Sequence, residues 1–341
     1  MRSLDELLEH LGDIRQVAGI DQYSIKGGQG DSNHILQVRN GMGLKFDVNV
    51  SRGFDLGLCE LFSVPVSWMS SCGRVSPYFY DKQGDEWNRG FEGGLMTTCG
   101  LTQAGKPNTD LDQMLGQHGR ISYVPAELLQ CELIQEHPER IVLRAKVRET
   151  KALSENISVY RTITTYLGKN EILIEDTVVN EGYEPVPHMI LYHFNFGFPL
   201  ISGTTKISKL ESDRELIKGE ADLCDPLSVR PVSRFEKPDV ILHTNIKSET
   251  NEIKFEIENL IKFNNWNRRL KLTLLYNKEQ CPYLTQWRYF GSGVNVFGIE
   301  PGNVSTKGRS YHRAAKLLDI LEHGQYRQYN LKINFELKED I

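Results

Sequence analysis

The feature that most constrains the fold is a long succession of short segments rich in β-branched and aromatic residues, separated by turn clusters. Residues 34–40 and 44–50 flank a Gly-Met-Gly turn and predict a hairpin. Residues 141–150 alternate apolar and charged side chains, as expected of a strand with one face in water. Similar segments follow at 157–166, 171–180, 270–277, 294–300 and 329–337. The sequence therefore predicts an all-β protein, a large antiparallel β-sandwich with a few short helices.

Two segments favour helices. At the N-terminus Ser3 and Glu6 form a capping box, and one face carries Leu4, Leu7, Leu8 and Leu11. Residues 1–20 are therefore expected to be a helix and its lead-in, and residues 312–321 are the second candidate. We expect a single domain over residues 1–341, and two domains are the alternative that this length allows.

Composition excludes several classes of function. A net charge of −5 and a pI near 6.0 leave no electrostatic footprint for nucleic acid. No apolar run approaches the length of a membrane span, and the N-terminus is too acidic for a signal peptide. The cysteines form no C-x-x-C pair and are expected to be reduced, mostly buried thiols of a cytoplasmic protein. The number of subunits stays open, a homodimer included.

The sharpest change in composition is a region rich in glycine and polar residues, 84–119. A connection of this length is too long to be idle, and long ordered loops tend to border functional sites. The chain contains no G-x-x-x-x-G-K-[ST] phosphate loop and no G-x-G-x-x-G that opens a helix. A Ser-His-Asp hydrolase has no nucleophile elbow to support it.

His193 lies among residues that otherwise suit a buried strand. In LYHFNFGFPL (191–200), alternation places His193, Asn195 and Leu191 on one face. An imidazole exchanges protons near neutral pH, so a half-buried one in a groove is a natural acid or base. The alternative is a core histidine that is hydrogen-bonded to the backbone. The asparagine on the same face favours a polar floor.

Glu300 ends the apolar run VNVFGI and precedes a Pro-Gly pair. Desolvation at that point would raise its pKa, which is how a carboxylate becomes a useful base near pH 7. Two alternatives stay open: a glutamate in water, and a glutamate paired with Arg288.

Other polar stretches give weaker signals. In GQHGRIS, the glycine at 119 lets the chain turn sharply, so His118 and Arg120 could present donors to a ligand. Asp213 in SDRELIKGE is either a ligand contact or part of a solvated turn. A metal site built from His118, His193 and His243 has no local support, because no H-x-H or H-E-x-x-H occurs.

Several stretches together resemble the aldose 1-epimerase (galactose mutarotase-like) superfamily, and more closely a divergent branch once filed as a domain of unknown function (DUF4432-like). They are SRGFDLG (51–57), GGLMTTCGLTQAG (93–105), QHGRISYVPAE (117–127), LYHFNFGFPL (191–200) and GIEPGN (298–303). The resemblance implies a large β-sandwich that holds a sugar in an open groove across one sheet.

The resemblance also implies roles for matching residues. Glu300 falls at the general base, which removes the proton from the anomeric hydroxyl, and His193 at the general acid, which protonates the ring oxygen. His118 matches a histidine that holds the sugar, and Asp213 an aspartate that binds sugar hydroxyls. The implied partner is a small-molecule sugar, and no metal or redox cofactor is needed.

One position departs from the family pattern. Related hexose-phosphate epimerases carry an arginine directly before the Gly-Gly pair, where this chain has Glu92, with Arg89 three residues earlier. Arg52, Arg89 and Arg120 are therefore the alternative anchors for a charged sugar.

The remaining candidates for sugar contact are Asn195, Gln286 and Trp287. Gln286 would contact a hydroxyl and Trp287 would stack on the ring, with core packing as the alternative for the tryptophan. Together these residues predict a cofactor-free isomerase that opens a sugar ring and recloses it on the other face. A metal-dependent sugar isomerase and a non-catalytic carbohydrate-binding protein are the alternatives, and the identity of the sugar stays open.

Overall fold

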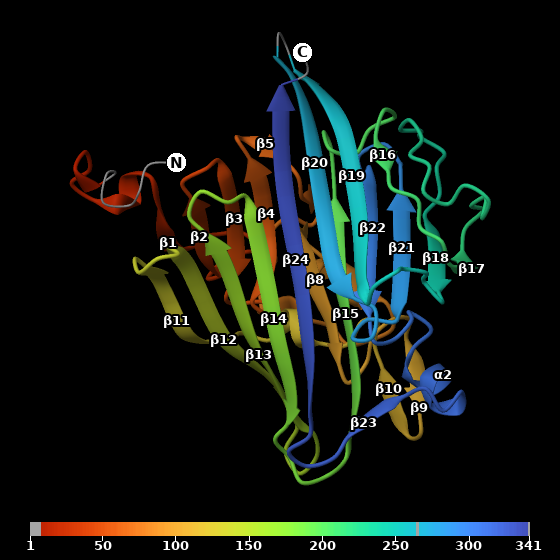
Figure 1. The fold of residues 1–341 in the computed structure, drawn as a ribbon. Coiled ribbons are helices and arrows are strands. Elements are labelled where there is room, and N and C mark those ends of the chain that lie inside the picture. Colours follow the sequence, from red (N-terminus) through yellow and green to blue (C-terminus); the bar gives the residue numbers. More distant parts are fainter. Residues whose placement is uncertain (1–7, 264–265, 340–341) are drawn as a thin grey trace.

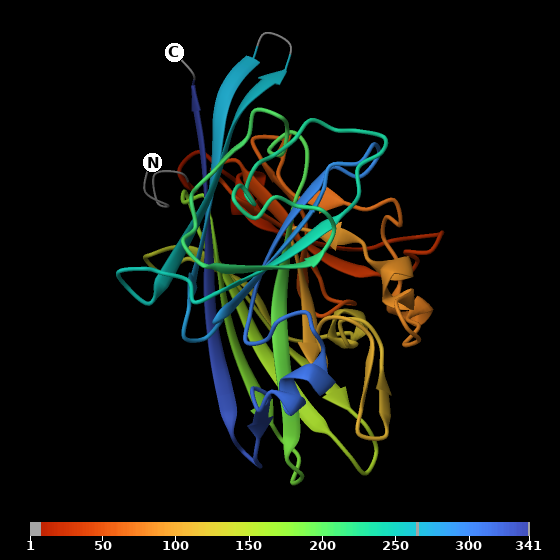
Figure 2. The same cartoon turned by 90° about the vertical axis from the view of Figure 1, so that its right-hand side faces the viewer.

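The computed structural model describes residues 8–263 and 266–339, which form two large antiparallel sheets packed face to face (Figures 1 and 2). This confirms the predicted all-β sandwich. In order across it, the larger, 12-stranded sheet contains β1 (Ala18–Ser24), β2 (His34–Asn40), β3 (Leu44–Asn49), β4 (Asp55–Leu61), β8 (Met96–Leu101), β15 (Val186–Phe196), β22 (Val296–Gly302), β21 (Tyr283–Tyr289), β18 (Asp239–Thr244) and β17 (Asp213–Lys218), with β5 (Val64–Pro65) beside β4 and β23 (Asp319–Leu321) beside β15.

The second, 8-stranded sheet covers one face of the first. It contains β11 (Glu127–Ile134), β12 (Arg140–Thr150), β13 (Asn156–Tyr166), β14 (Glu171–Asn180), β24 (Tyr326–Glu339), β20 (Trp266–Asn277), β19 (Glu252–Phe263) and β16 (Lys206–Ile207). The smaller elements are the pairs β6 (Trp68–Met69) with β7 (Gly93–Gly94) and β9 (Asn108–Asp110) with β10 (Gln113–Leu115), the 3-10 turns η1 (Ile14–Gln16), η2 (Pro77–Phe79), η3 (Glu86–Gly90) and η4 (Ile121–Tyr123), and the helix α2 (Arg309–Ala314).

Strand β15 is buried on both faces, which explains the apolar run around His193. Ile190, Tyr192 and Phe194 point into the core between the sheets. Met189 and Leu191 point the other way, into a second apolar cluster on the outer face of the larger sheet. Because successive side chains in a strand alternate, His193 lies on this outer face. Trp68 of β6, Trp87 of η3 and other aromatic side chains complete the second cluster and bury the strand there.

The structure differs from the sequence prediction at the two segments that were expected to be helical. The segment 312–321 is helical only in its first residues, because α2 ends at Ala314 and Lys316 adopts a left-handed φ of 59°. Its last three residues instead form β23, which pairs with β15. The N-terminal capping residues Ser3 and Glu6 lie outside the described residues. The lead-in is also shorter than predicted, since β1 already begins at Ala18.

The central core joins strands from nearly the whole chain, from Leu36 to Phe335, and on this basis we propose that the chain is one domain. All six cysteines are free thiols; Cys59, Cys99 and Cys281 are buried, and Cys224 is exposed. Among the described residues, no helix is long and apolar enough to cross a membrane.

A buried ionic cluster around Arg161 of β13 ties the two sheets together. The guanidinium donates to both oxygens of Asp176 on β14, at 2.9 and 2.7 Å, and to Oδ1 of Asp55 on β4 of the other sheet, at 2.8 Å. It also donates to Oγ1 of Thr98 on β8, at 2.9 Å, and the Tyr192 hydroxyl on β15 donates to Asp176 at 2.8 Å. Burial disfavours the charge, but the two carboxylates outweigh it and hold the pKa of Arg161 above its usual value.

Removing the charge of Arg161 tests this cluster. We expect R161M to lower the free energy of unfolding by about 3–5 kcal/mol, because two buried carboxylates would lose their partner. Urea denaturation followed by tryptophan fluorescence would measure the loss. The control is R15M, which breaks an ion pair with Asp13 whose side chains are 70% and 49% exposed and should leave the midpoint unchanged. Equal midpoints for R161M and wild type would refute the proposed role.

Candidate active site

His193 and Glu300 meet on neighbouring strands. Phe194 of β15 pairs with Ile299 of β22, and both side chains point to the core face. The strands are antiparallel, so the residue before Phe194 and the residue after Ile299, which are His193 and Glu300, lie side by side on the outer face. There His193 Nε2 and Glu300 Oε1 are 3.1 Å apart, and the two side chains are only 6% and 3% exposed. The alternative pairing of Glu300 with Arg288 is not found, since Arg288 donates to Asp239 at 3.0 Å.

Burial dominates the electrostatics of this pair. Burial, followed by the neighbouring His118 ring, lowers the pKa of His193 to about 3. Burial also raises the pKa of Glu300 well above its usual value. An uncharged carboxylic acid beside an uncharged imidazole, or a carboxylate beside an imidazolium, each holds one proton. Both shifts favour the uncharged distribution, in which the titratable proton lies on Glu300 and faces the imidazole across the 3.1 Å contact.

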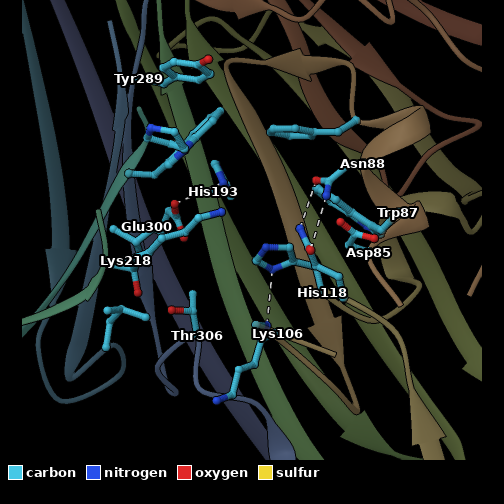
Figure 3. Close-up of a pocket in the computed structure, with 18 residues that line it drawn as sticks. Asp85, Trp87, Asn88, Lys106, His118, His193, Lys218, Tyr289, Glu300 and Thr306 are labelled. Atoms are coloured by element: carbon cyan, nitrogen blue, oxygen red, sulfur yellow. Dashed lines mark hydrogen bonds and ion pairs between the residues drawn. The ribbon is translucent and has the colours of Figure 1, made fainter. Parts of the chain in front are cut away.

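The pair lies at a pocket of about 460 Å³ on the outer face of the larger sheet (Figure 3). The pocket has the size of a small-molecule site. Its walls come from the predicted loop region 84–119, from β17, β18, β21 and β22, and from the chain just after β22. The lining residues are Asp85, Trp87, Asn88, Phe91, Gly105, Lys106, Gln117, His118, His193, Ile217, Lys218, Pro238, Val240, Thr285, Trp287, Tyr289, Glu300 and Thr306.

His118 faces the pair from the loop after β10. His118 lies in a sharp turn of the backbone, in which φ is 55° at His118 and 70° at Gly119. A Cβ at Gly119 would lie 2.4 Å from two backbone carbonyl oxygens, so only glycine fits there. Nδ1 of His118 accepts a hydrogen bond from Gly105 N–H at 3.4 Å, so Nε2 carries the ring proton and is a donor toward the pocket. Burial lowers the pKa of His118 to about 4, which keeps the ring neutral.

Aromatic side chains form the apolar wall. The Trp287 ring on β21 lies 5.5 Å from the His193 ring, and Phe91 lies 5.2 Å from it, centroid to centroid. Trp287 opposes Gly298 on β22, where the missing side chain leaves room for the indole. Trp287 is half-buried, so part of its ring remains open to a ligand.

Of the predicted site residues, the structure brings together Glu300, His193, His118 and Trp287. Gln286 does not line the pocket, because it precedes Trp287 and points to the other face of β21, where Oε1 contacts His243 at 3.1 Å. Asn195 is buried and donates to the His193 carbonyl oxygen at 2.9 Å, so it supports the strand rather than facing the pocket.

The other predicted polar contacts lie elsewhere. Asp213 begins β17, whereas the pocket lies at the Lys218 end, about 17 Å along the strand at ~3.3 Å per residue. Arg89 is exposed and pairs with Glu86. Arg120 is exposed, with its guanidinium 5.9 Å from the Tyr80 ring centroid.

Arg52 is buried in a structural role. Its guanidinium donates to Glu92 Oε1 at 2.9 Å and to the carbonyl oxygens of Ser122, Val75 and Gly90 at 3.0, 3.2 and 2.7 Å. These hydrogen bonds join Arg52 to the neighbouring loops, and its side chain does not line the pocket.

Several lining residues were not predicted from the sequence. Thr285 pairs directly with Glu300 across β21 and β22, and its buried Oγ1 has no partner among the described residues. Oγ1 of Thr306 is likewise buried and unpartnered. Thr285 could have been found by strand alternation, since it lies two residues before Trp287. Lys106 and Lys218 have no comparable signal in the sequence.

No group of three or more metal-binding side chains occurs within residues 8–263 and 266–339. His118 and His193 share the pocket, with ring centroids 6.0 Å apart. His243 does not join them, because its Nδ1 contacts Ser212 Oγ at 2.8 Å and its Nε2 contacts Gln286.

Acid stability tests the neutral state of His118. Unfolded histidine takes up a proton near pH 6.5, whereas folded His118 stays neutral down to about pH 4. The unfolded chain binds more protons in this window, so stability falls as the pH falls, by about 2 kcal/mol between pH 7 and 5 for this residue. We expect H118Q to lose that much less than wild type, measured by urea denaturation at both pH values. H137Q, at a side chain that is 89% exposed, should lose as much as wild type; equal losses in H118Q and wild type would contradict the prediction.

Comparisons with known proteins identify the family of the chain and relatives of its fold. A family model described as a domain of unknown function (DUF4432) matches residues 30–335. The structure of a "putative aldose 1-epimerase" from Klebsiella pneumoniae superposes with a TM-score of 0.83 at 23% identity, covering 94% of this chain and 83% of the other. A search of curated proteins finds no match.

More distant structures share the fold at lower identity. A galactose mutarotase-like protein from Clostridium acetobutylicum gives a TM-score of 0.58 at 13% identity, covering 94% of this chain and 99% of its own. Galactose 1-epimerase from Lactobacillus acidophilus gives 0.53 at 12% identity, covering 94% and 100%. The chain therefore belongs to the DUF4432 family and has the galactose mutarotase-like fold.

Proposed function

We propose that this protein interconverts the anomers of a sugar by acid–base ring opening, without a cofactor. The observation that carries the proposal is the 3.1 Å contact between His193 and Glu300, a buried imidazole and a buried carboxyl group that meet at a pocket. Structural relatives that are named as epimerases or mutarotases support the same class of reaction. A binding protein would need the pocket and its aromatic wall, but it has no use for a paired acid and base.

The proton movements follow from the pair. With sugar bound, the Glu300 carboxylate takes the proton of the anomeric hydroxyl while the His193 imidazolium donates a proton to the ring oxygen. The bond from C1 to the ring oxygen breaks, and C1 becomes a carbonyl carbon. After rotation about C1–C2, the reverse transfers close the ring on the other face, so no proton is gained or lost.

The burial of the pair suits this cycle. After ring opening Glu300 is protonated and His193 is neutral, which is the distribution that burial favours in the empty pocket. The charged distribution needed to start gains stability when sugar hydroxyls hydrogen-bond to it. Ring closure by the reverse transfers returns the pair to the charged distribution, so either anomer can be opened by the same steps.

The other lining residues would hold the sugar. Nε2–H of His118 is oriented as a donor, and the unpartnered hydroxyls of Thr285 and Thr306 can each donate and accept. The open part of the Trp287 ring suits the apolar face of a pyranose.

Substitution of the pair tests the proposal. We expect E300Q and H193N each to reduce anomer exchange by about 10²–10⁴-fold while the fold is retained, because each variant removes one proton-transfer partner. NMR exchange spectroscopy on a panel of aldoses at equilibrium would measure the rates, and circular dichroism would check the fold.

D213N is the matched control. It changes a carboxylate that the family resemblance assigns to the sugar but that lies at the far end of β17, so it should exchange anomers at the wild-type rate. Sugar binding without any acceleration by the wild type would replace the proposal with a binding function. Wild-type rates in E300Q would exclude Glu300 as the base.

A further inference from the structure

We propose that the pocket selects a sugar that carries an anionic group, a carboxylate or a phosphate, and that Lys218 and Lys106 recognise this charge. The inference rests on the proposed function, whose site it completes. Both lysines line the pocket that contains His193 and Glu300, and Figure 3 shows them on different walls.

A β-bulge turns Lys218 toward the pocket. β17 pairs with β18 in regular register up to Leu216, and the register then shifts before Lys218. In a regular strand, consecutive residues face opposite sides, yet Ile217 and Lys218 both line the pocket. A bulge re-aims a side chain in this way, and bulges are frequent beside active sites.

Lys106 is positioned by backbone contacts on both sides. Its N–H donates to the Thr306 carbonyl oxygen at 2.9 Å. The preceding Gly105 contacts Nδ1 of His118 and has a φ of 88°, and a Cβ there would lie 2.2 Å from the Thr306 carbonyl oxygen. The base of Lys106 is therefore fixed between the histidine that faces the acid–base pair and a threonine whose hydroxyl is unpartnered.

Neither lysine has a partner within the protein. No described residue forms an ion pair or a hydrogen bond with Nζ of Lys106 or Lys218. Nearby lysines that do not line the pocket are paired: Lys307 with Glu215 at 2.6 Å, and Lys237 with Glu220 at 3.2 Å.

The charge balance of the pocket points to an anion. Among its lining residues the acids are Asp85 and Glu300, and Glu300 lies 3.1 Å from the His193 ring, so that the pair adds no net charge in either of its one-proton distributions. Two lysines against Asp85 leave a positive pocket on a chain of net charge −5. A lysine binds carboxylate or phosphate as a point charge, and a pocket of one sign concentrates a ligand of the other.

Three probes of one stereochemistry test the inference: glucose, glucuronate and glucose 6-phosphate. We expect wild-type kcat/KM for anomer exchange to be at least about tenfold higher for an anionic probe than for glucose, as one charge-assisted hydrogen bond allows. K218Q and K106Q should each remove about tenfold for the anionic probe, while glucose changes by less than about twofold. Added salt should weaken the preference.

The control variant is K237Q, which removes an exposed lysine outside the pocket and should change none of the three rates. Preference for glucuronate would identify a carboxylate as the anionic group, and preference for glucose 6-phosphate would identify a phosphate. The proposal is overturned if glucose is the best substrate, or if K218Q and K106Q slow all three probes alike.

Calorimetric binding of the same probes to E300Q separates the two proposals. In one outcome the wild type turns over no probe, yet the anionic probes bind more tightly than glucose and K218Q lowers their affinity. The charge recognition then stands and the ring-opening function fails. If neutral and anionic probes exchange equally well, the function stands and the charge recognition fails. If no probe binds or reacts, both proposals are rejected.

Discussion

The buried Arg161 cluster is the constraint from which the site geometry follows. It joins β13 and β14 of one sheet to β4, β8 and β15 of the other through hydrogen bonds of 2.7–2.9 Å. Loss of a partner would leave a buried charge uncompensated, so the cluster favours the registration of the two sheets in which these groups meet. Tyr192 is one of the partners, and the next residue along β15 is His193. The cluster holds Tyr192 on the core face of β15, and this contact also positions the next residue, His193, on the outer face.

The same apolar surroundings that stabilise β15 also set the chemistry of its outer face. The cluster that contains Trp87, Phe91 and Leu191 removes water from around His193, and this desolvation is the main cause of its lowered pKa. Desolvation acts on Glu300 in the opposite direction, because there the charged form is the deprotonated one. Desolvation thus lowers the pKa of His193 and raises that of Glu300, and this leaves a pair in which a proton can be transferred in either direction. In this fold the packing of an aromatic cluster and the tuning of an acid–base pair are one physical effect.

Sequence was informative where a polar residue interrupts an apolar strand. This pattern singled out His193 and Glu300, the proposed acid–base pair. Alternation placed Asn195 on the same face as His193, and there its amide donates to the carbonyl oxygens of Gly94 and His193. The prediction for Gln286 failed because its strand face was not worked out, and the one for Asp213 because a motif does not show which end of a strand meets the site. Lys218 could not be predicted, since its orientation depends on a bulge that is defined only by the pairing of β17 with β18.

Glu92 anchors a wall of the pocket through its contacts with Arg52 and the Val75 N–H. At the position where the family resemblance implies an arginine, this chain has a carboxylate that accepts from Arg52 and from the Val75 N–H, at 2.9 and 2.8 Å. Arg52 also holds the carbonyl oxygens of Gly90 and Ser122, so the loop that carries Trp87 is anchored at its base. The guanidinium of Arg52, which could have bound an anionic ligand, therefore holds the wall of the pocket instead. Any anion recognition must then come from other elements, and the cations that remain within the pocket lining are the lysines of β17 and of the Gly105 turn.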